Sequence, residues 1–139
     1  MNTILIPDNS TAISCPICIS SVEAGFPSPA EDYMEGSLDL NRHLIKHPAA
    51  TFFVRVSGDS MINAGIHPGD ILIVDRSLEA TDKKIVIAVI DGELTVKRLR
   101  YRNALISLEP ENEDYHPISI TQEKSMEIWG VVTNVIHKV

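Results

Sequence analysis

Two residues of this chain could together break a peptide bond, a serine at position 60 and a lysine at position 97. Ser60 lies in Val-Ser-Gly-Asp-Ser-Met and Lys97 in Leu-Thr-Val-Lys-Arg-Leu, each at or near the edge of an apolar, strand-like run. A serine beside a deprotonated lysine can attack a carbonyl without any histidine. The bond between Ala24 and Gly25, in a leader with little predicted structure, offers a target. The hypothesis from these residues is a protease whose substrate is its own leader.

Strand alternation predicts the direction of Lys97. In a strand, Lys97 shares one face with Thr95, Leu99 and Tyr101, whereas the opposite face carries Val96 and three arginines (Arg98, Arg100 and Arg102). Three arginines mark a solvated face, so we expect Lys97 to be buried beside Leu99, where lost hydration lowers its pKa. A pKa near 7 instead of about 10.4 corresponds to roughly 4–5 kcal/mol of disfavoured charge. Two alternatives stay open, a Lys97 that extends past Leu99 into solvent and a basic stripe that touches phosphate or an acidic partner.

The surroundings of Ser60 favour an exposed hydroxyl near free backbone donors. Gly58 frees the backbone after the strand, and residues 60–64 can form a helical turn before Gly65. The first N–H groups of such a turn have no partner within it, so those of Ser60 and Met61 could hold an oxyanion. The alternative is that Ser60 only caps the turn, which is common for serine.

Other chemistry-bearing residues give weaker signals. His67 and Asp70 are close in sequence and could belong to a histidine triad, although triads assemble in space rather than in sequence. The remaining histidines are scattered and show no metal-ligand spacing (His43, His47, His116 and His137). Cys15 and Cys18 are half of a zinc site or a redox pair, and we expect two reduced thiols in a mobile arm. No cofactor and no metal site is expected.

The chain of 139 residues, 44% hydrophobic and 22% charged, fits one domain with a substantial core. Residues 1–28 are rich in proline, serine and threonine and are expected to form a flexible arm, followed by a β domain over residues 29–139. Ser28-Pro29-Ala30-Glu31 predicts a short helix with a capping box, and a second helix should begin near Asp39 and end before Pro48. Predicted strands are Thr51–Ser57, Ile71–Asp75, Ile85–Asp91, Glu93–Tyr101, Ala104–Glu109 and Met126–Ile136.

These strands are short and closely spaced, and Asp91-Gly92 is a strong signal for a hairpin between two of them. The fold class is therefore mostly β, a compact antiparallel domain that is folded over or partly closed, with short helices at its front. The formal net charge of −7 disfavours a broad DNA-binding surface. No apolar run approaches the roughly 20 residues that span a bilayer, and no Lys or Arg precedes Arg42, so a cytoplasmic location is expected.

The motifs together resemble the LexA/UmuD family of self-cleaving serine proteases, peptidase S24, and within it the UmuD branch. The resemblance rests on Ser57-Gly58-Asp59-Ser60-Met61, Gly69-Asp70 and Thr95-Val96-Lys97-Arg98, and it extends over nearly the whole chain. It includes the leader segment from Ala24 to Ala30 and the closing Trp129-Gly130-Val131-Val132. It implies a fold like the LexA C-terminal and signal-peptidase type.

What the resemblance implies about function is specific. Ser60 would be the nucleophile and Lys97 the general base, and the chain would cut its Ala24–Gly25 bond when stimulated by a RecA filament on single-stranded DNA. The product would be a homodimer that serves a UmuC-like, error-prone Y-family DNA polymerase subunit in translesion synthesis during the SOS response. Close relatives can have cysteine directly before the cut. The alanine at this position instead matches the repressor-type site.

Two other functions are weighed against this one. A non-catalytic binding module that regulates a polymerase subunit would never be truncated yet would still associate with its partner. A signal peptidase has a similar catalytic core, but the lack of a membrane segment counts against it.

Overall fold

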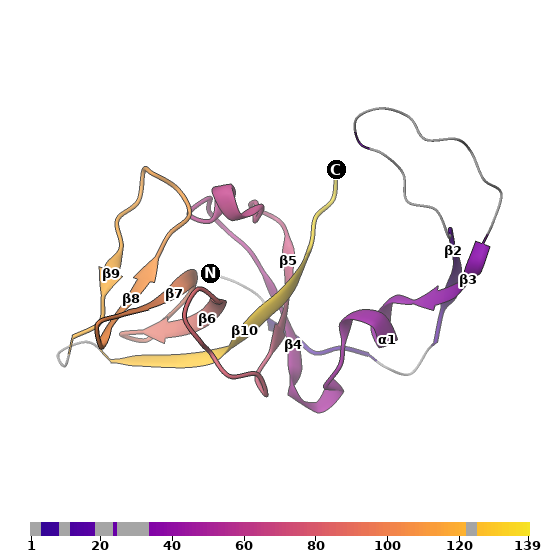
Figure 1. Cartoon of the computed structure of the whole chain (residues 1–139), viewed down its shortest axis with the longest axis horizontal. Helices are drawn as coiled ribbons and strands as arrows, with labels where there is room; N and C mark the ends of the chain where they lie inside the picture. The colour runs from indigo at the N-terminus through magenta and orange to yellow at the C-terminus, as the bar shows by residue number, and fades with distance from the viewer. Residues whose placement is uncertain (1–3, 9–11, 19–23, 25–33, 122–124) are drawn as a thin grey trace. The chain divides into compact units, whose positions relative to one another are not determined.

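The computed structural model describes residues 4–8, 12–18, 24, 34–121 and 125–139, which belong to two compact units. The first unit comprises residues 1–7 and 47–139, and the second comprises residues 8–46. The first unit contains Ser60 and Lys97 and is built on a large antiparallel sheet (Figure 1). The mostly β, antiparallel fold class is therefore confirmed, whereas the division at residue 28 stays a prediction.

The sheet of the first unit has eight strands in the order β1-β4-β5-β10-β6-β7-β8-β9. Its end strands β1 and β9 do not pair with each other, so the sheet stays open. Two short 3₁₀ helices, Pro48–Ala50 and Ile62–Ala64, flank β4 in sequence. The strands are β1 (Ile4–Leu5), β4 (Thr51–Arg55), β5 (Ile71–Asp75), β6 (Ile85–Ile90), β7 (Glu93–Arg102), β8 (Leu105–Glu109), β9 (Ile118–Ser119) and β10 (Met126–Ile136).

Strand β10 joins the two halves of the sheet. Its first part, from Met126 to Val131, pairs with β6, and its second part, from Val131 to Ile136, pairs with β5. The register shifts once within each of these two pairings. β10 is therefore the strand through which the β5 side and the β6 side of the sheet are hydrogen-bonded together, and Figure 1 shows its long course across the sheet.

The hairpin predicted at Asp91-Gly92 is confirmed. Strands β6 and β7 pair from Ile90 and Glu93 onward, which leaves a two-residue turn. Asp91 has φ 49° and Gly92 φ 82°, the positive values that a type I′ turn requires at both central positions. This turn fixes the register of β7 and thereby the face on which Lys97 lies.

Two clusters of buried side chains form the core of this unit. One gathers around β4, β5 and the Ile62–Ala64 turn, and the other lies between β6, β7, β8 and β10. Strand β6 contributes to both, because Ile87 belongs to the first cluster while Val86 and Ala88 belong to the second. Burial on both faces explains why β6 is an uninterrupted apolar run.

Gly130 lies where β10 passes between β5 and β6, and we expect Gly130→Ala to destabilise the fold. An added Cβ would lie 2.7 Å from Val74 Cγ1 and 3.1 Å from the Asp75 carbonyl oxygen. Such overpacking typically costs about 1–3 kcal/mol of unfolding free energy, measurable by urea denaturation. Glu127→Ala, at an exposed position of the same strand, should stay within about 0.5 kcal/mol of the parent chain. Equal stability of both variants would contradict the close packing at Gly130.

Asp75, at the end of β5, is a buried carboxylate with several partners. His47 Nδ1 lies 2.6 Å from Oδ2, and Oδ1 accepts hydrogen bonds from the hydroxyl and the backbone N–H of Ser77. Burial acts to raise the pKa of Asp75, but the hydrogen bonds from Ser77 and His47 outweigh it and hold that pKa below its ordinary value. The ionised carboxylate is therefore favoured by the folded state.

A lowered carboxyl pKa makes stability depend on pH in a defined direction. The contribution of Asp75 is present above the unfolded pKa of about 3.9 and is lost as the pH falls through the folded value. Urea midpoints at pH 7 and pH 3 should therefore differ less in Asp75→Asn than in the parent chain. Glu127→Gln, a neutralised exposed carboxylate, should keep the full difference. An unchanged pH dependence in Asp75→Asn would contradict the assignment.

The second unit pairs β2 (Ser14–Cys18) with β3 (Met34–Asp39), which leads into helix α1 (Leu40–Leu44). Asp39 caps this helix, because its Oδ1 accepts a hydrogen bond from the Asn41 N–H at 3.0 Å. The helix predicted from Asp39 is thus confirmed. The capping-box helix predicted from Ser28 falls on residues outside those described, and the chain is already a strand at Met34.

Candidate active site

Ser60 lies in a tight loop between β4 and β5. Gly58 and Gly65 have φ values of 79° and 80°, left-handed conformations that let the chain reverse on each side of the serine. Met61 is 1% exposed and belongs to the first core cluster, so the residue after Ser60 anchors the loop. The helical turn predicted over residues 60–64 is present as the 3₁₀ helix Ile62–Ala64, which ends at Gly65.

The structure brings Ser60 and Lys97 together. Lys97 Nζ lies 3.0 Å from Ser60 Oγ, 3.0 Å from Thr95 Oγ1 and 3.1 Å from the Val96 carbonyl oxygen. The contact with Thr95, two residues away on the same strand face, agrees with the predicted alternation along β7. Lys97 is half-buried and does not simply extend into solvent.

Burial is the cause of the altered acidity of Lys97. Loss of hydration lowers the pKa of its amine below the ordinary value of 10.5. None of the ion pairs between described residues involves Lys97, so no carboxylate among those residues stabilises its protonated, charged form. The three neighbours suit a neutral amine, which can donate to Thr95 and Val96 and accept from the Ser60 hydroxyl.

Two backbone donors lie next to the Ser60 hydroxyl. The N–H groups of Ser60 and Met61 form no hydrogen bond with any of the residues that the structure describes. The carbonyl groups of the same residues are engaged, because Ser60 O accepts from Glu111 and Met61 O accepts from Ala64. The loop is therefore held through its carbonyl groups while its first amides stay available for an acceptor.

A second segment, residues 110–117, holds the Ser60 loop in place. The Glu111 N–H donates to Ser60 O at 2.8 Å, and the Glu111 carbonyl accepts from the Asn63 N–H at 2.8 Å. Asp59 is bound by the same segment, because Asn112 Nδ2 donates to its carbonyl oxygen and the Tyr115 hydroxyl donates to Oδ1 at 2.6 Å. The hydrogen bond to Asp59 and its charge raise the pKa of Tyr115.

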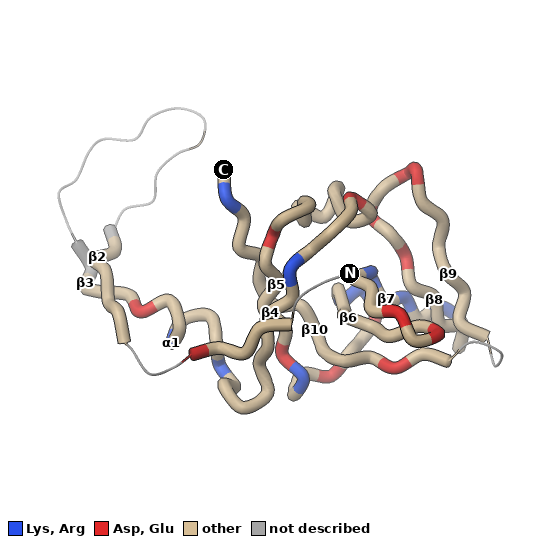
Figure 2. The backbone as a smooth tube through the Cα atoms, turned by 180° about the vertical axis from the view of Figure 1, so that it is seen from behind, with Lys and Arg blue, Asp and Glu red and all other residues tan. Residues whose placement is uncertain are grey.

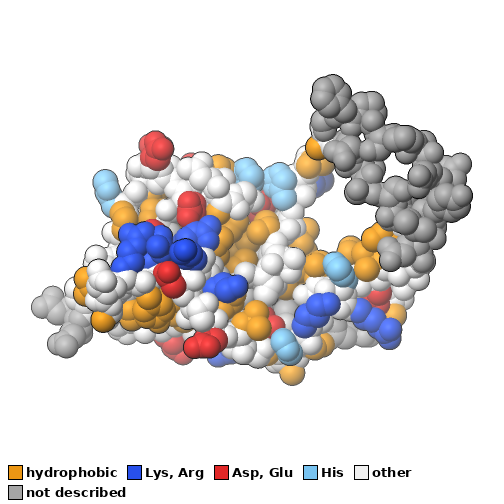
Figure 3. All heavy atoms as spheres, viewed as in Figure 1, with side chains coloured by type: hydrophobic (Ala, Val, Ile, Leu, Met, Phe, Trp, Pro, Cys, Tyr) orange, Lys and Arg blue, Asp and Glu red, His pale blue; other side chains and the backbone are white. Residues whose placement is uncertain are grey.

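The arginines of β7 are paired within the chain. Arg98 Nε lies 2.5 Å from Glu111 Oε1, which ties the 110–117 segment to the strand of Lys97. Arg100 contacts Asp82 and Glu109, and Arg102 contacts Glu109 as well. Basic and acidic residues accordingly lie interspersed along the backbone around β7 and β8 (Figure 2). On the molecular surface, the largest group of Lys and Arg side chains in Figure 3 has acidic side chains beside it. The predicted solvated face is thus partly buried, and its charges are balanced by carboxylates of the same chain.

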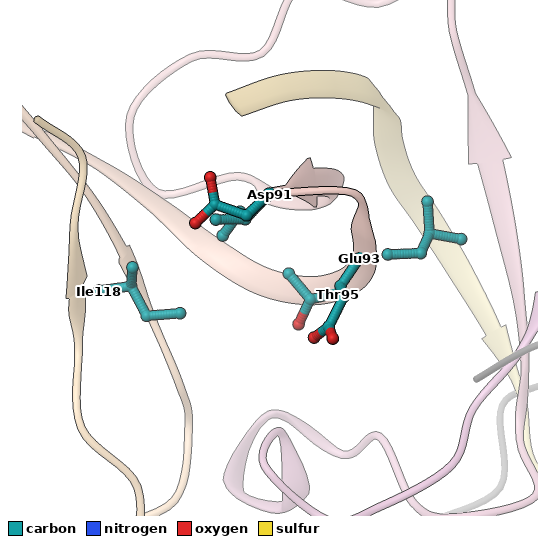
Figure 4. Close-up of a pocket in the computed structure, with 6 residues that line it drawn as sticks. Asp91, Glu93, Thr95 and Ile118 are labelled. Carbon is teal, nitrogen blue, oxygen red and sulfur yellow. The ribbon is translucent and has the colours of Figure 1, made fainter. Parts of the chain in front are cut away.

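A pocket of about 410 Å³ adjoins Thr95. Glu93 and Thr95 extend to the same side of β7, and Ile118 faces them from β9 (Figure 4). The pocket and the Lys97 amine therefore share one neighbour, Thr95, whose hydroxyl lies 3.0 Å from Lys97 Nζ. The lining residues are Ile90, Asp91, Glu93, Leu94, Thr95 and Ile118.

The histidine triad does not form among the described residues. His67 Nδ1 lies 3.7 Å from Asp70 Oδ2, which is too far for a hydrogen bond. The hydrogen-bond partner of the Ser60 hydroxyl is Lys97 and not a histidine. The structure does, however, bring His67 and Asp70 together with His137, which sequence spacing did not suggest.

The residues of the predicted leader are described only in part. Ala24 is exposed, and Gly25 lies outside the described residues. Cys15, in β2, is an exposed free thiol, and the pairing of β2 with β3 brings Cys15 opposite Leu38. No helix among the described residues is long and apolar enough to cross a membrane.

Comparison with known proteins agrees with this geometry. A family model described as peptidase S24-like matches residues 16–133. The chain is 48% identical to protein ImpA of Escherichia coli over 136 residues, which cover 95% of this chain and 90% of the relative. It is 48% identical to protein MucA of Escherichia coli over 122 residues, covering 87% and 83% of the two chains. It is 40% identical to the LexA repressor of Shewanella denitrificans over 120 residues, covering 86% of this chain and 58% of the repressor. The chain belongs to the peptidase S24-like family.

Proposed function

We propose that this chain is a serine endopeptidase that cuts its own Ala24–Gly25 bond, with Ser60 as nucleophile and Lys97 as general base. The observation that carries the proposal is the 3.0 Å distance between Lys97 Nζ and Ser60 Oγ, at a lysine whose pKa is lowered by burial. A general base must lie within hydrogen-bond reach of the proton that it removes, and a lysine can act as one only when its amine is neutral. Lys97 meets the first requirement, and its burial favours the neutral amine.

The reaction follows from these positions. The Lys97 amine takes the proton of the Ser60 hydroxyl while Oγ bonds to the carbonyl carbon of Ala24, and the carbonyl electron pair moves to its oxygen. The free N–H groups of Ser60 and Met61 stabilise that oxyanion. Lys97 then passes its proton to the Gly25 nitrogen as the peptide bond breaks. Water hydrolyses the remaining ester and restores Ser60.

The chain between the target bond and Ser60 is long enough for self-cleavage, since an extended residue spans roughly 3.3 Å. Tethering raises the effective concentration of the bond, so a slow dyad can complete a single cut. In this account residues 1–28 are the arm and residues 29–139 the protease-like domain. The pocket beside Thr95, whose hydroxyl contacts the Lys97 amine, is the site that we propose for part of the bound segment.

The cut would also change the sheet. Ile4 and Leu5 of β1 pair with Val54 and Phe53 of β4, and residues 1–24 would leave with the released fragment. The edge of β4 would then lose its neighbour and present unpaired backbone groups. Cleavage therefore exposes a strand edge as well as shortening the chain.

The downstream role is proposed from the family and from the likeness to proteins named ImpA and MucA. Cleavage is stimulated by a RecA filament on single-stranded DNA, which favours the docked arm, and the shortened homodimer acts with a UmuC-like Y-family polymerase subunit in the cytoplasm. A net charge of −7 is consistent with contact through protein partners rather than directly with DNA.

The experiment is an intact-mass time course of the purified full chain at alkaline pH. The expected product begins at Gly25, as confirmed by N-terminal sequencing, and Ser60→Ala is expected to remain at 139 residues. A full chain that stays uncut under all conditions yet binds a polymerase subunit would favour the non-catalytic binding module. Cleavage at the same bond in Ser60→Ala would indicate a different protease.

A further inference from the structure

A cluster of three metal-ligating side chains lies outside the Ser60–Lys97 site. Asp70 directly precedes β5, and His137 directly follows β10, near the marked C-terminus (Figure 1). Because Ile71 and Ile136 are paired across these antiparallel strands, Asp70 and His137 meet at one end of the sheet. His67 reaches them from the turn before β5. One ligand atom from each of the three residues lies within 4.8 Å of the other two.

The cluster contains a buried nitrogen that has no partner among the described residues. His67 Nδ1 is inaccessible to solvent and makes no hydrogen bond to any of them, although the His67 ring itself is partly exposed. The Asp70 side chain is 3% exposed, and its Oδ1 lies 2.6 Å from His137 Nδ1. Its Oδ2 accepts a hydrogen bond from the His67 backbone N–H at 2.8 Å. Buried polar atoms are nearly always satisfied, so the unpartnered ring nitrogen calls for an additional group.

We propose that His67, Asp70 and His137 form a three-ligand site for a divalent transition-metal ion of the zinc class. Two imidazole nitrogens and one carboxylate are a donor set that zinc accepts with a fourth position open to water, whereas calcium and magnesium require mainly oxygen ligands. Metal–ligand bonds of about 2.0 Å place tetrahedral ligand atoms roughly 3.3 Å apart. The two histidine rings, each about two-fifths exposed, are free to move to that spacing around the buried Asp70.

The site would brace the loop that carries Ser60. Val56 and the Gly69–Asp70 turn form the base of this loop, since the Val56 N–H donates to Asp70 O and the Gly69 N–H donates to Val56 O. An ion held by Asp70 and His137 would tie that base to the end of β10. Metal binding should therefore stabilise the folded first unit by an amount that rises with the logarithm of the metal concentration once that exceeds the dissociation constant.

The chain contains a matched control for this site. His47 Nδ1 lies 2.6 Å from Asp75 Oδ2, the same histidine–carboxylate contact as in the His137–Asp70 pair. Among the described residues, His67, Asp70 and His137 form a group with three possible metal ligands, whereas no second imidazole joins the pair of His47 and Asp75. His47→Ala therefore removes a comparable pair without touching the proposed site.

The test is titration of the full chain with zinc chloride by calorimetry, and with cobalt chloride by visible absorption. All variants carry Ser60→Ala, so that cleavage does not interfere, and Cys15→Ser with Cys18→Ser, so that thiols cannot bind the metal. We expect one ion per chain, tetrahedral cobalt bands, and a melting temperature that rises with zinc. His137→Ala and His67→Ala should each weaken binding at least about tenfold, since even second-shell changes cost 10–100-fold.

His47→Ala should bind the metal as the parent does. His137 is exposed and lies beyond the last strand, so His137→Ala keeps the test valid even if His67→Ala fails to fold. An absence of zinc binding in the thiol-free chain, or binding that survives His137→Ala unchanged, would overturn the proposal. Because every chain in this test lacks Ser60, its outcome is independent of the self-cleavage mechanism.

Discussion

Lys97→Ala is expected to lower the rate of self-cleavage by about 10²- to 10⁴-fold, the usual contribution of a positioned general base. This corresponds to roughly 3–5 kcal/mol of activation free energy. The loss follows because Lys97 Nζ is the group within 3.0 Å of Ser60 Oγ that can take its proton. The rate is measured by intact mass over time at fixed pH, in parallel with the urea unfolding curve of each variant.

Three companion variants separate the chemistry from charge and folding. Lys97→Arg keeps a positive charge but cannot lose its proton, so it should be as slow as Lys97→Ala. The double variant Ser60→Ala with Lys97→Ala should be no slower than Ser60→Ala alone, since the two residues act as one unit. Lys84→Ala, an exposed lysine before β6, should cleave at the parent rate. Full activity in Lys97→Arg would show that a charge rather than a base is required.

The cleavage rate of the parent chain should rise about tenfold per pH unit and then reach a plateau below pH 10.5. The direction follows from the lowered pKa of Lys97, since the reactive neutral amine increases as the pH approaches that value. An ordinary lysine would level off only near 10.4, and a histidine base near 6.5. Initial rates across the alkaline range, with circular dichroism as a check of folding, measure the midpoint.

Two results would contradict Lys97 as a base whose pKa is lowered by burial. A plateau that reaches the parent rate in Lys97→Arg would point to a different base, such as a histidine, and His67→Ala and His116→Ala would then test two candidates. A rate that keeps rising beyond pH 10.5 would indicate a lysine that is not perturbed by burial or direct attack by hydroxide. The residual rate of Lys97→Arg supplies the background, because arginine stays protonated throughout this range.

Local patterns predicted most of the β elements. Strands β5 and β10 have the predicted bounds, and β6, β7 and β8 differ by one residue at one end. Their alternation and turn residues are local properties, which a sequence displays directly. Strands β1 and β9 are only two residues long, too short to show an alternation of apolar and polar residues. Among the described residues, strands β2 and β3 pair only with each other, and their sequences show no such alternation.

The candidate site was predictable where it depends on local geometry. The alternation along β7 placed Lys97 on the face of Leu99, and the glycines around Ser60 predicted its turn. What holds that turn was not predictable, because Asn112 and Tyr115 lie 53 and 56 residues from Asp59. The same holds for Asp70 and His137, which are separated by 67 residues. Only the order of strands in the sheet brings such residues together.

The proposed mechanism requires Lys97 to be a neutral amine beside Ser60, and an NMR titration of the Lys97 side chain tests this directly. The full chain carrying Ser60→Ala, labelled with ¹³C in lysine, allows the Cε shift to be followed with pH without cleavage, and Lys97→Arg identifies the signal by its loss. We predict a midpoint below 10.5 that agrees with the midpoint of the cleavage rate in the parent chain. A Lys97 that titrates near 10.5, as exposed lysines do, would contradict the account.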